Sequence, residues 1–394
     1  MTSTKLTDVA EEFAADVVLA DDISGFSAPD PQTVSEVFLT GATGFLGAFL
    51  LRDLLRQGLV VHCLVRGADE AAARARLEDN LRTYELLDGL DMDRVRVHTG
   101  DITRPRLGLA QETYTDLTGR IGAVYHSAAK VNFLTIYKWL RKATVEATHE
   151  ILRLACAAGA PLHHVSTTGV FYAGTDRTPR GELDPTGPPE DLSLGYTKSK
   201  WVAEQLVLEA SRRGVPVTIH RPGQVWGDSQ SGACQPNDFV WRFIKGSLQL
   251  GLYPRRFRLE MNMVPVDYVS AVIVTASRHP EGIGGIYHQV SPGTLDSERI
   301  LKLMRGAGYE VQEVSILKWM KAIAADLTNS MAPLLSILAE SDKVEVAEFA
   351  DDLTRDLLKG TGVDCPAIDE AVFGAYVAYF VRHGILPAPQ AQDA

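Results

Sequence analysis

Three side chains in the middle of the sequence could together assist the transfer of a hydride to a carbonyl group. Tyr196 and Lys200 stand four positions apart in a stretch that predicts a helix, so both lie on one face of it. A tyrosine hydroxyl has an ordinary pKa of about 10, and a nearby lysine ammonium favours its ionised form. A surface Tyr–Lys pair is equally common, but Thr167 follows a predicted strand, where its hydroxyl would project toward the same cleft. Together, one group would orient a carbonyl oxygen, one would protonate it and one would tune the proton donor.

A glycine-rich turn lies upstream of these residues. Gly41, Gly44 and Gly47 follow the apolar residues 37–39, which predicts a strand, a tight turn and a helix start. Gly41 allows the turn, Gly44 lets backbone amides approach a diphosphate, and Gly47 lets the helix pack on the strand. An ordinary βα turn is the alternative. A helical run over 45–56 followed by an apolar run over 59–65 favours a nucleotide-binding βαβ unit.

The residue after the second predicted strand bears on the choice of dinucleotide. Sites that prefer NAD place a carboxylate there to accept the ribose hydroxyls, whereas this chain has Arg66, which suits a 2'-phosphate. Asp69 and Glu70 could compete, but they lie past the end of the strand. We therefore expect NADPH as the cofactor.

Strands alternate with helical runs over the first half of the chain, which predicts an α/β fold with a doubly wound parallel sheet of the Rossmann type. We expect residues 1–35 to be an acidic leader or linker and 36–234 to be the NADP-binding domain. Residues 235–394 are expected to form a mainly helical, substrate-binding C-terminal region, with residues near 262–290 returning to the Rossmann domain.

Composition narrows the class of protein. The 394 residues are 45% hydrophobic and 23% charged, as in ordinary globular proteins, and the formal charge of -11 argues against nucleic-acid binding. No apolar run is long enough for a membrane span, and the acidic first twenty residues do not resemble a secretory signal. We expect a cytoplasmic protein with no bound metal, because the four cysteines lie far apart and lack metal-ligand spacing: Cys63, Cys156, Cys234 and Cys365.

The motifs GATGFLG, STTGV and YTKSK resemble those of the extended short-chain dehydrogenase/reductases. Within that superfamily, CLVR, HSAAKVN, GYTKSKW and RPG resemble the terminal thioester reductase domains of nonribosomal peptide synthetases, polyketide synthases and carboxylic acid reductases. The resemblance implies catalytic roles for Thr167, Tyr196 and Lys200. It also implies a phosphopantetheine thioester on an acyl or peptidyl carrier protein as substrate, reduced to an aldehyde or further to an alcohol. Thr144 stands where many extended members carry asparagine.

The cofactor contacts that we expect extend along the predicted carboxyl edge of the sheet. Arg76 resembles a second phosphate contact of the family, although a solvated helix arginine is nearly as common. Asp101 and Ile102 resemble the pair on the adenine side, against the alternative of an ordinary loop aspartate. The full predicted set is Gly41, Thr43, Gly44, Phe45, Leu46, Gly47, Arg66, Arg76, Asp101, Ile102, Ser127, Ala128, Ala129, Lys130, Tyr196, Lys200, Pro222, Gly223 and Val225.

The substrate side gives weaker signals. Arg255, Arg256 and Arg258 could form a basic docking patch for an acidic carrier protein, although a solvated loop is the simpler reading. Four large apolar residues nearby are expected in the core rather than in an acyl pocket: Trp241, Phe243, Met261 and Met263. The alternatives that stay open are a fatty acyl-CoA reductase, a nucleotide-sugar-modifying member of the same superfamily, and a non-catalytic nucleotide-sensing protein on the same fold.

Overall fold

The structure is a computed structural model that describes residues 13–131, 134–171, 178–257, 260–335 and 348–389. Its centre is a seven-stranded parallel sheet with the strand order β11-β6-β5-β4-β1-β2-β3. The strands of this sheet are β1 (Glu36–Thr40), β2 (Val60–Val65), β3 (Val95–Thr99), β4 (Ala123–His126), β5 (Leu162–Val165), β6 (Val217–Pro222) and β11 (Ile286–Gln289).

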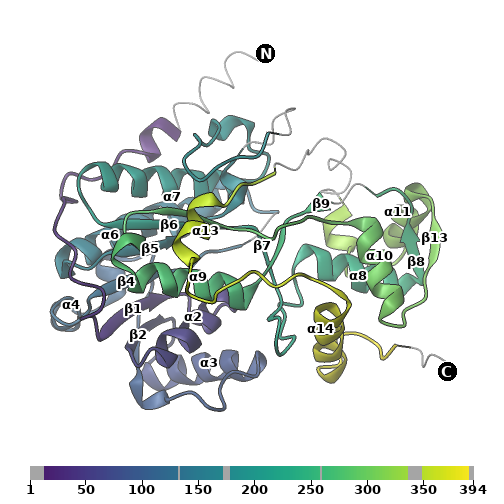
Figure 1. The fold of residues 1–394 in the computed structure, drawn as a ribbon, viewed down its shortest axis with the longest axis horizontal. Helices are drawn as coiled ribbons and strands as arrows, with labels where there is room; N and C mark the ends of the chain where they lie inside the picture. The colour runs from purple at the N-terminus through teal and green to yellow at the C-terminus, as the bar shows by residue number, and fades with distance from the viewer. Residues whose placement is uncertain (1–12, 132–133, 172–177, 258–259, 336–347, 390–394) are drawn as a thin grey trace.

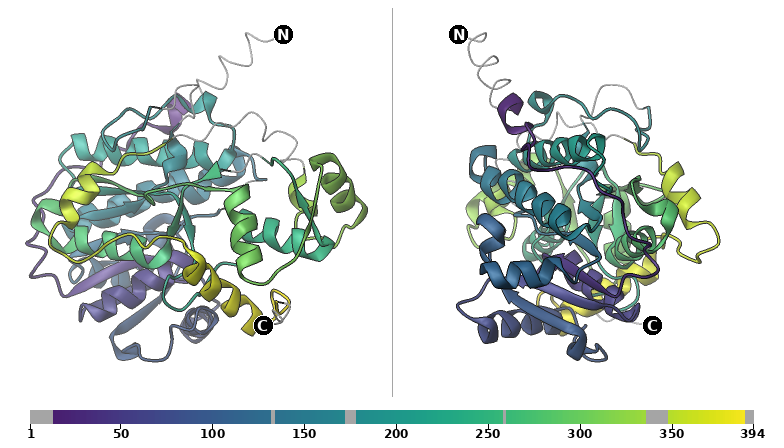
Figure 2. Two further views of the ribbon diagram at one scale, coloured as in Figure 1. Left: turned by 45° about the vertical axis from the view of Figure 1, so that its right-hand side comes forward. Right: turned by 90° about the vertical axis from the view of Figure 1, so that its left-hand side faces the viewer.

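The strand order reverses at β1, because β2 pairs with it on one side and β4 on the other. All seven strands are parallel, so their carboxyl ends meet at one edge of the sheet. The crevice of a doubly wound sheet opens at this edge, where the strand order reverses. The strands are almost entirely buried, since helices cover both faces of the sheet (Figures 1 and 2). The prediction of a Rossmann-type α/β fold is confirmed.

Two hydrophobic clusters hold the layers together. One face of the sheet packs against α2, α3 and α9, and its core continues into the C-terminal region. The other face packs against α4, α6 and α7, with Phe13, Leu19 and Ile23 of the leader added to it. The helices of this part are α2 (Phe45–Arg56), α3 (Glu70–Thr83), α4 (Gln111–Thr118), α5 (Tyr137–Arg141), α6 (Ala147–Ala158), α7 (Gly195–Arg212) and α9 (Val266–Arg278).

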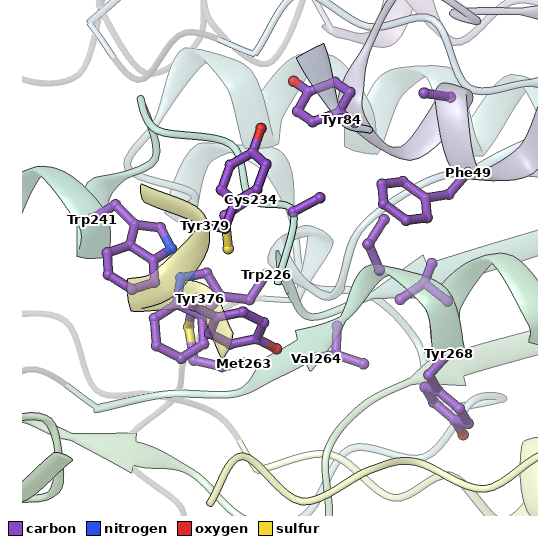
Figure 3. Packing of buried hydrophobic residues seen from close by; sticks show 14 of the residues in the cluster. Phe49, Tyr84, Trp226, Cys234, Trp241, Met263, Val264, Tyr268, Tyr376 and Tyr379 are labelled. Atoms are coloured by element: carbon purple, nitrogen blue, oxygen red, sulfur yellow. The ribbon is translucent and has the colours of Figure 1, made fainter. Parts of the chain in front are cut away.

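Most of the C-terminal region lies to one side of the sheet (Figure 1), whereas α13 lies over the sheet; the region combines helices with short strand pairs. An aromatic cluster joins its last helix to the Rossmann part: Trp226 and Trp241 stack with ring centroids 5.1 Å apart and Tyr376 packs edge-on against both (Figure 3). The elements are β7 (Gln224–Trp226), α8 (Phe239–Leu250), β8 (Leu252–Pro254), β9 (Glu260–Met261), β10 (Met263–Pro265), β12 (Leu295–Asp296), α10 (Ser297–Gly306), β13 (Gln312–Val314), α11 (Ile316–Ala325), α13 (Asp352–Leu358) and α14 (Glu370–Arg382).

Three segments from the second half of the chain pack with the Rossmann part. Strand β11 pairs in parallel with β6, α9 lies against α2, and α13 packs against β11 and α9. An ion-pair cluster supports the second contact, since Ser270 donates to Asp53 at 2.6 Å and Arg52 binds Asp53 at 2.7 Å. The division of the chain at residue 234 remains a prediction.

Candidate active site

The glycine turn between β1 and α2 has the geometry that a diphosphate requires. Gly41 has φ +85°, and a Cβ added there would lie 2.7 Å from the backbone nitrogen of Ala128. A Cβ on Gly47 would lie 1.9 Å from the Gly41 carbonyl oxygen. Helix α2 begins after Gly44 with no side-chain cap and no acidic residue in its first turn. Its amino end therefore suits an anion, and these residues fit a dinucleotide cofactor.

Two side chains that sequence analysis did not single out hold this turn in place. Asn80 of α3 donates from Nδ2 to the carbonyl oxygens of Ala42 at 3.2 Å and Gly44 at 3.3 Å. Thr40, at the end of β1, accepts from the amide of Ala128 at 3.3 Å and contacts His126 Nδ1 at 2.8 Å. The turn is thus joined to α3 on one side and to the end of β4 on the other.

The end of β2 presents positive charge, as predicted. Arg66 and Arg76 are both exposed, and Arg76 Nη1 donates to the carbonyl oxygen of Arg66 at 3.2 Å. Asp69, the possible competitor, caps α3 by accepting from the amide of Ala72 at 2.8 Å. A carboxylate used in this way is a poor acceptor for ribose hydroxyls, whereas the two guanidinium groups can meet a phosphate.

Asp101, predicted to lie on the adenine side, follows β3 at the same edge of the sheet. Its Oδ1 accepts from the amide of Thr103 at 2.9 Å and from the Thr103 hydroxyl at 2.8 Å. Burial raises the pKa of this carboxyl, but the two bonds from Thr103 and the charge of Arg66 outweigh burial, and the pKa falls below its ordinary value. Ile102 is half-buried against the core beneath. Asp101 is therefore ionised at neutral pH, and its carboxylate is held by hydrogen bonds within the loop.

The three predicted catalytic residues come from two elements that touch. Lys200 of α7 is 3% exposed and donates from Nζ to the carbonyl oxygen of Val165, the last residue of β5, at 2.5 Å. Thr167 follows two residues later and accepts from the amide of Gly169 at 3.1 Å. A Cβ on Gly169 would lie 3.0 Å from Cγ2 of Thr197, which follows Tyr196. The loop after β5 and the start of α7 are thus in contact.

Burial shifts the pKa values of Tyr196 and Lys200 in opposite directions. It raises the pKa of Tyr196 to about 12 and lowers that of Lys200 to about 8, although the Glu204 carboxylate opposes the shift of Lys200. The sequence led us to expect a lowered pKa for the phenol beside Lys200, but the pKa is raised, because desolvation of the phenolate is the larger effect. Tyr196 therefore carries its proton at neutral pH, in the form that can donate it.

Two buried histidines adjoin Lys200. Burial lowers the pKa of His126 to about 3, and it lowers the pKa of His164 well below its ordinary value; the nearby Lys200 charge adds to both shifts. Both imidazoles are therefore neutral at neutral pH. Their rings lie 5.5 Å apart on neighbouring strands. The ammonium of Lys200 is consequently the positive charge at this position.

Sequence analysis also missed a buried ion pair beside these residues. Arg221 Nη2 binds Glu204 Oε1 at 2.6 Å, and Ser166 Oγ donates to Glu204 Oε2 at 2.5 Å. Glu204 stands four positions after Lys200 on the buried face of α7. A second charged residue, four positions after Lys200 and next to the apolar Val202 and Ala203, was the signal available in the sequence.

The remaining predicted cofactor contacts lie along the same edge. Ser127, Ala128, Ala129 and Lys130 follow β4, with the last two exposed. Gly223 donates its amide to the Gln289 carbonyl oxygen at 2.9 Å, and a Cβ on it would lie 2.7 Å from the Asn262 carbonyl oxygen. The others are Thr43 in the glycine turn, Phe45 and Leu46 at the start of α2, Pro222 at the end of β6 and Val225 in β7.

Other predicted features lie elsewhere. Arg255 approaches Glu313 at 3.9 Å, so its charge is partly compensated, and Arg258 lies outside the described residues. Trp241, Phe243 and Met263 are buried in the core, as expected, and Met261 is partly buried against it. Cys234 lies among Trp226, Tyr376 and Tyr379 (Figure 3). Thr144 is buried in a π-helical turn, Lys142–Glu146, between α5 and α6.

Metal-binding clusters and membrane spans are both absent from the described residues. In the part of the chain that the structure describes, no three His, Cys, Asp or Glu side chains gather as the ligands of a metal ion would. Among the helices described, none combines the length and the apolar character needed to cross a bilayer.

Comparison with known proteins places this site in a family. A family model described as male sterility protein, for an NAD-binding domain, matches residues 39–273. The chain is 38% identical over 373 residues to a linear gramicidin synthase protein of Brevibacillus parabrevis, covering 92% of this chain and 7% of that protein. It is 33% identical over 396 residues to the L-2-aminoadipate reductase large subunit of Penicillium chrysogenum, covering 91% and 28%. The chain thus spans less than a third of the length of these relatives.

Solved structures agree with this placement. The terminal R domain of the myxalamid PKS-NRPS pathway superposes with a TM-score of 0.89 at 38% identity, covering 97% of this chain and all of that one. The reductase domain of a nonribosomal peptide synthetase from Mycobacterium tuberculosis superposes with a TM-score of 0.78 at 26% identity, covering 96% and 99%. The similarity thus extends through the C-terminal region as well as the Rossmann part.

Proposed function

The chain belongs to the male sterility protein family and is a terminal reductase domain of the nonribosomal peptide and polyketide synthase type; from this premise we propose that it reduces a carrier-bound thioester with NADPH. The product of the first reduction is an aldehyde, which leaves with release of the carrier's thiol. The observation that carries the proposal is the bond from Lys200 Nζ to the Val165 carbonyl oxygen. It joins the helix of Tyr196 to the strand that precedes Thr167, at the same carboxyl edge of the sheet as the glycine turn.

Each of the three residues has one task. The Thr167 hydroxyl orients the carbonyl oxygen of the thioester, and Tyr196 donates its proton to that oxygen as negative charge develops on it. Lys200 lowers the free-energy cost of the phenolate that Tyr196 becomes, because its ammonium lies one helical turn away. NADPH, when bound, supplies the hydride. The resulting hemithioacetal then collapses to a thiol and an aldehyde without an enzyme nucleophile.

The choice of NADPH over NADH rests on the end of β2. Arg66 and Arg76 offer two guanidinium groups there, and Asp69 is occupied as a helix cap. A 2'-phosphate carries two negative charges that guanidinium groups bind in a bidentate manner. We assign the glycine turn to the diphosphate and Asp101 to the adenine side.

An acyl or peptidyl carrier protein is the partner that this reaction requires. The linear gramicidin synthase protein is far longer than this chain, which matches 7% of it. We infer that a reductase region inside so long a protein receives its substrate from a neighbouring carrier. We further propose that residues 36–234 bind the cofactor and that 235–394, apart from the segment near 262–290, bind the acyl or peptidyl chain.

Oxidation of reduced nicotinamide tests the proposal. The purified chain is offered a carrier-loaded thioester, free acyl-CoA and a UDP-sugar, each with NADPH and with NADH, and products are identified by mass spectrometry. We expect the carrier-loaded thioester with NADPH to give the fastest turnover and an aldehyde or alcohol product. Preference for free acyl-CoA or a UDP-sugar would instead support the corresponding superfamily rival. Cofactor binding without consumption on any substrate would support a nucleotide sensor.

A further inference from the structure

The buried ion pair between Glu204 and Arg221 has no part in the mechanism above. Glu204 is fully buried and Arg221 is 2% exposed. The guanidinium contacts both carboxylate oxygens, with Nη2 at 2.6 Å from Oε1 and Nε at 3.1 and 3.2 Å from Oε1 and Oε2. A buried salt bridge carries a desolvation cost that often equals its attraction, so stability alone is a weak account of it.

The ion pair connects elements that contribute to the active site. Glu204 accepts from Ser166 Oγ at 2.5 Å, and Ser166 stands between Val165, which accepts from Lys200, and Thr167. Two successive residues of the chain are therefore bound to α7, one through its carbonyl and one through its side chain. Rotation of the loop that carries Thr167 would break both bonds.

Arg221, the cation of the pair, links Glu204 to two further segments of the chain. Arg221 Nη1 donates to the carbonyl oxygen of Glu182 at 3.0 Å and lies 3.3 Å from His288 Nε2 on β11. Arg221 itself belongs to β6 and precedes Pro222 and Gly223, which are predicted cofactor contacts. One carboxylate thus holds the ends of β5 and β6 against α7.

Glu204 also acts on Lys200 through its charge. Of the groups facing Lys200, His126 on β4 and His164 on β5 are neutral at neutral pH, and Tyr196 keeps its proton. From β6 the charge is that of Arg221, which is paired. The Glu204 carboxylate is the group that favours the ammonium form of Lys200 against burial.

We propose, building on the proposed function, that Glu204 is a positioning residue: it holds the loop of Thr167 against α7 and keeps Lys200 charged while Tyr196 gives up its proton. The role has two separable parts. The bond to Ser166 sets position, and the negative charge sets the protonation of Lys200.

The variant Glu204→Gln tests whether the negative charge of Glu204 keeps Lys200 protonated. The rate constant kcat/KM for a free acyl thioester with NADPH is measured from pH 6 to 10. The carboxylate favours the ammonium, so without it Lys200 deprotonates at lower pH, and we expect the alkaline limb to move down by about one pH unit. Glu204→Asp retains the charge on a shorter side chain, so its alkaline limb should stay at the wild-type pH while kcat falls. An unshifted limb in folded Glu204→Gln would overturn the charge role.

The position is tested with Ser166→Ala, which leaves the ion pair intact. We expect kcat to fall on the order of tenfold with a KM for NADPH within about threefold of wild type, because the loop is less well placed for the transition state. A kcat within about twofold of wild type would overturn the positioning role. If Glu204→Gln leaves Arg221 unpaired and yields no folded protein in thermal unfolding, Ser166→Ala decides the positioning role, and the alkaline limb of Glu204→Asp decides the charge role, because a limb displaced from the wild-type pH in that variant would overturn it.

A matched control removes a carboxylate from the opposite end of the sheet. Glu36 begins β1 and binds Arg120 and His62, so Glu36→Gln loses comparable contacts without approaching the site. Its pH profile should coincide with that of the wild type. An inactive wild-type chain would refute the proposed function, whereas an active wild type with unchanged profiles in the Glu204 and Ser166 variants would refute only this inference.

Discussion

Asn80→Ala should weaken NADPH binding without slowing the chemical step. Asn80 contributes two hydrogen bonds, at 3.2 and 3.3 Å, to the carbonyl oxygens of the glycine turn. A hydrogen bond of this type contributes roughly 0.5 to 1.5 kcal/mol net, and these two distances are at the long end of the normal range. The pair is therefore worth about 1 to 2 kcal/mol, which corresponds to a roughly 5- to 30-fold weaker Kd.

We expect the substitution to weaken binding rather than to slow catalysis. Without these two hydrogen bonds the glycine turn is less ordered in the free protein, and the free energy needed to order it is subtracted from that of diphosphate binding. The assay is a titration of NADPH followed by its fluorescence, together with steady-state kcat at saturating cofactor. We expect a raised Kd and a kcat within about twofold of wild type. Asp79→Ala is the control, since Asp79 precedes Asn80 on α3 but pairs with Arg82 on the exposed side. A Kd for NADPH within twofold of wild type in Asn80→Ala would refute the role of Asn80 in holding the glycine turn.

Three further outcomes follow from the site. Tyr196→Phe should bind NADPH normally in the same titration but lose about 10²- to 10⁴-fold in kcat, because it lacks the proton donor; a near-wild-type rate would remove Tyr196 from that role. Arg66→Ala should raise the KM for NADPH by at least tenfold and leave that for NADH almost unchanged, since only the former carries a 2'-phosphate; equal losses for both would contradict the assignment. Because burial lowers the pKa of Lys200 to about 8 and the ammonium is the active form, kcat/KM in the wild type should fall above that pH. A profile that stays level to pH 10 would show that Lys200 keeps its charge.

Much of the site could be predicted because its signals are local in the sequence. The glycine spacing at 41, 44 and 47, the arginine after β2 and the interval between Tyr196 and Lys200 each depend on a few neighbouring residues. Backbone conformation and helix periodicity are determined over a few neighbouring residues, so the residue types in these short stretches predict the local geometry directly. Thr167 needed only the assumption that strand ends meet at one edge.

The tertiary structure decided what depends on packing between distant segments. Asn80 reaches Ala42 and Gly44 only because the folded chain brings α3 to the glycine turn, and Glu204 meets Arg221 and Ser166 only where three elements converge. Burial is likewise a property of the folded chain, and it reversed the sequence-based expectation for the pKa of Tyr196. The sequence by itself determined the dinucleotide fold and pointed to the groups that we propose take part in the reaction. Their supports and protonation states were decided by the fold, because hydrogen bonds and desolvation depend on distances in space rather than on intervals along the chain.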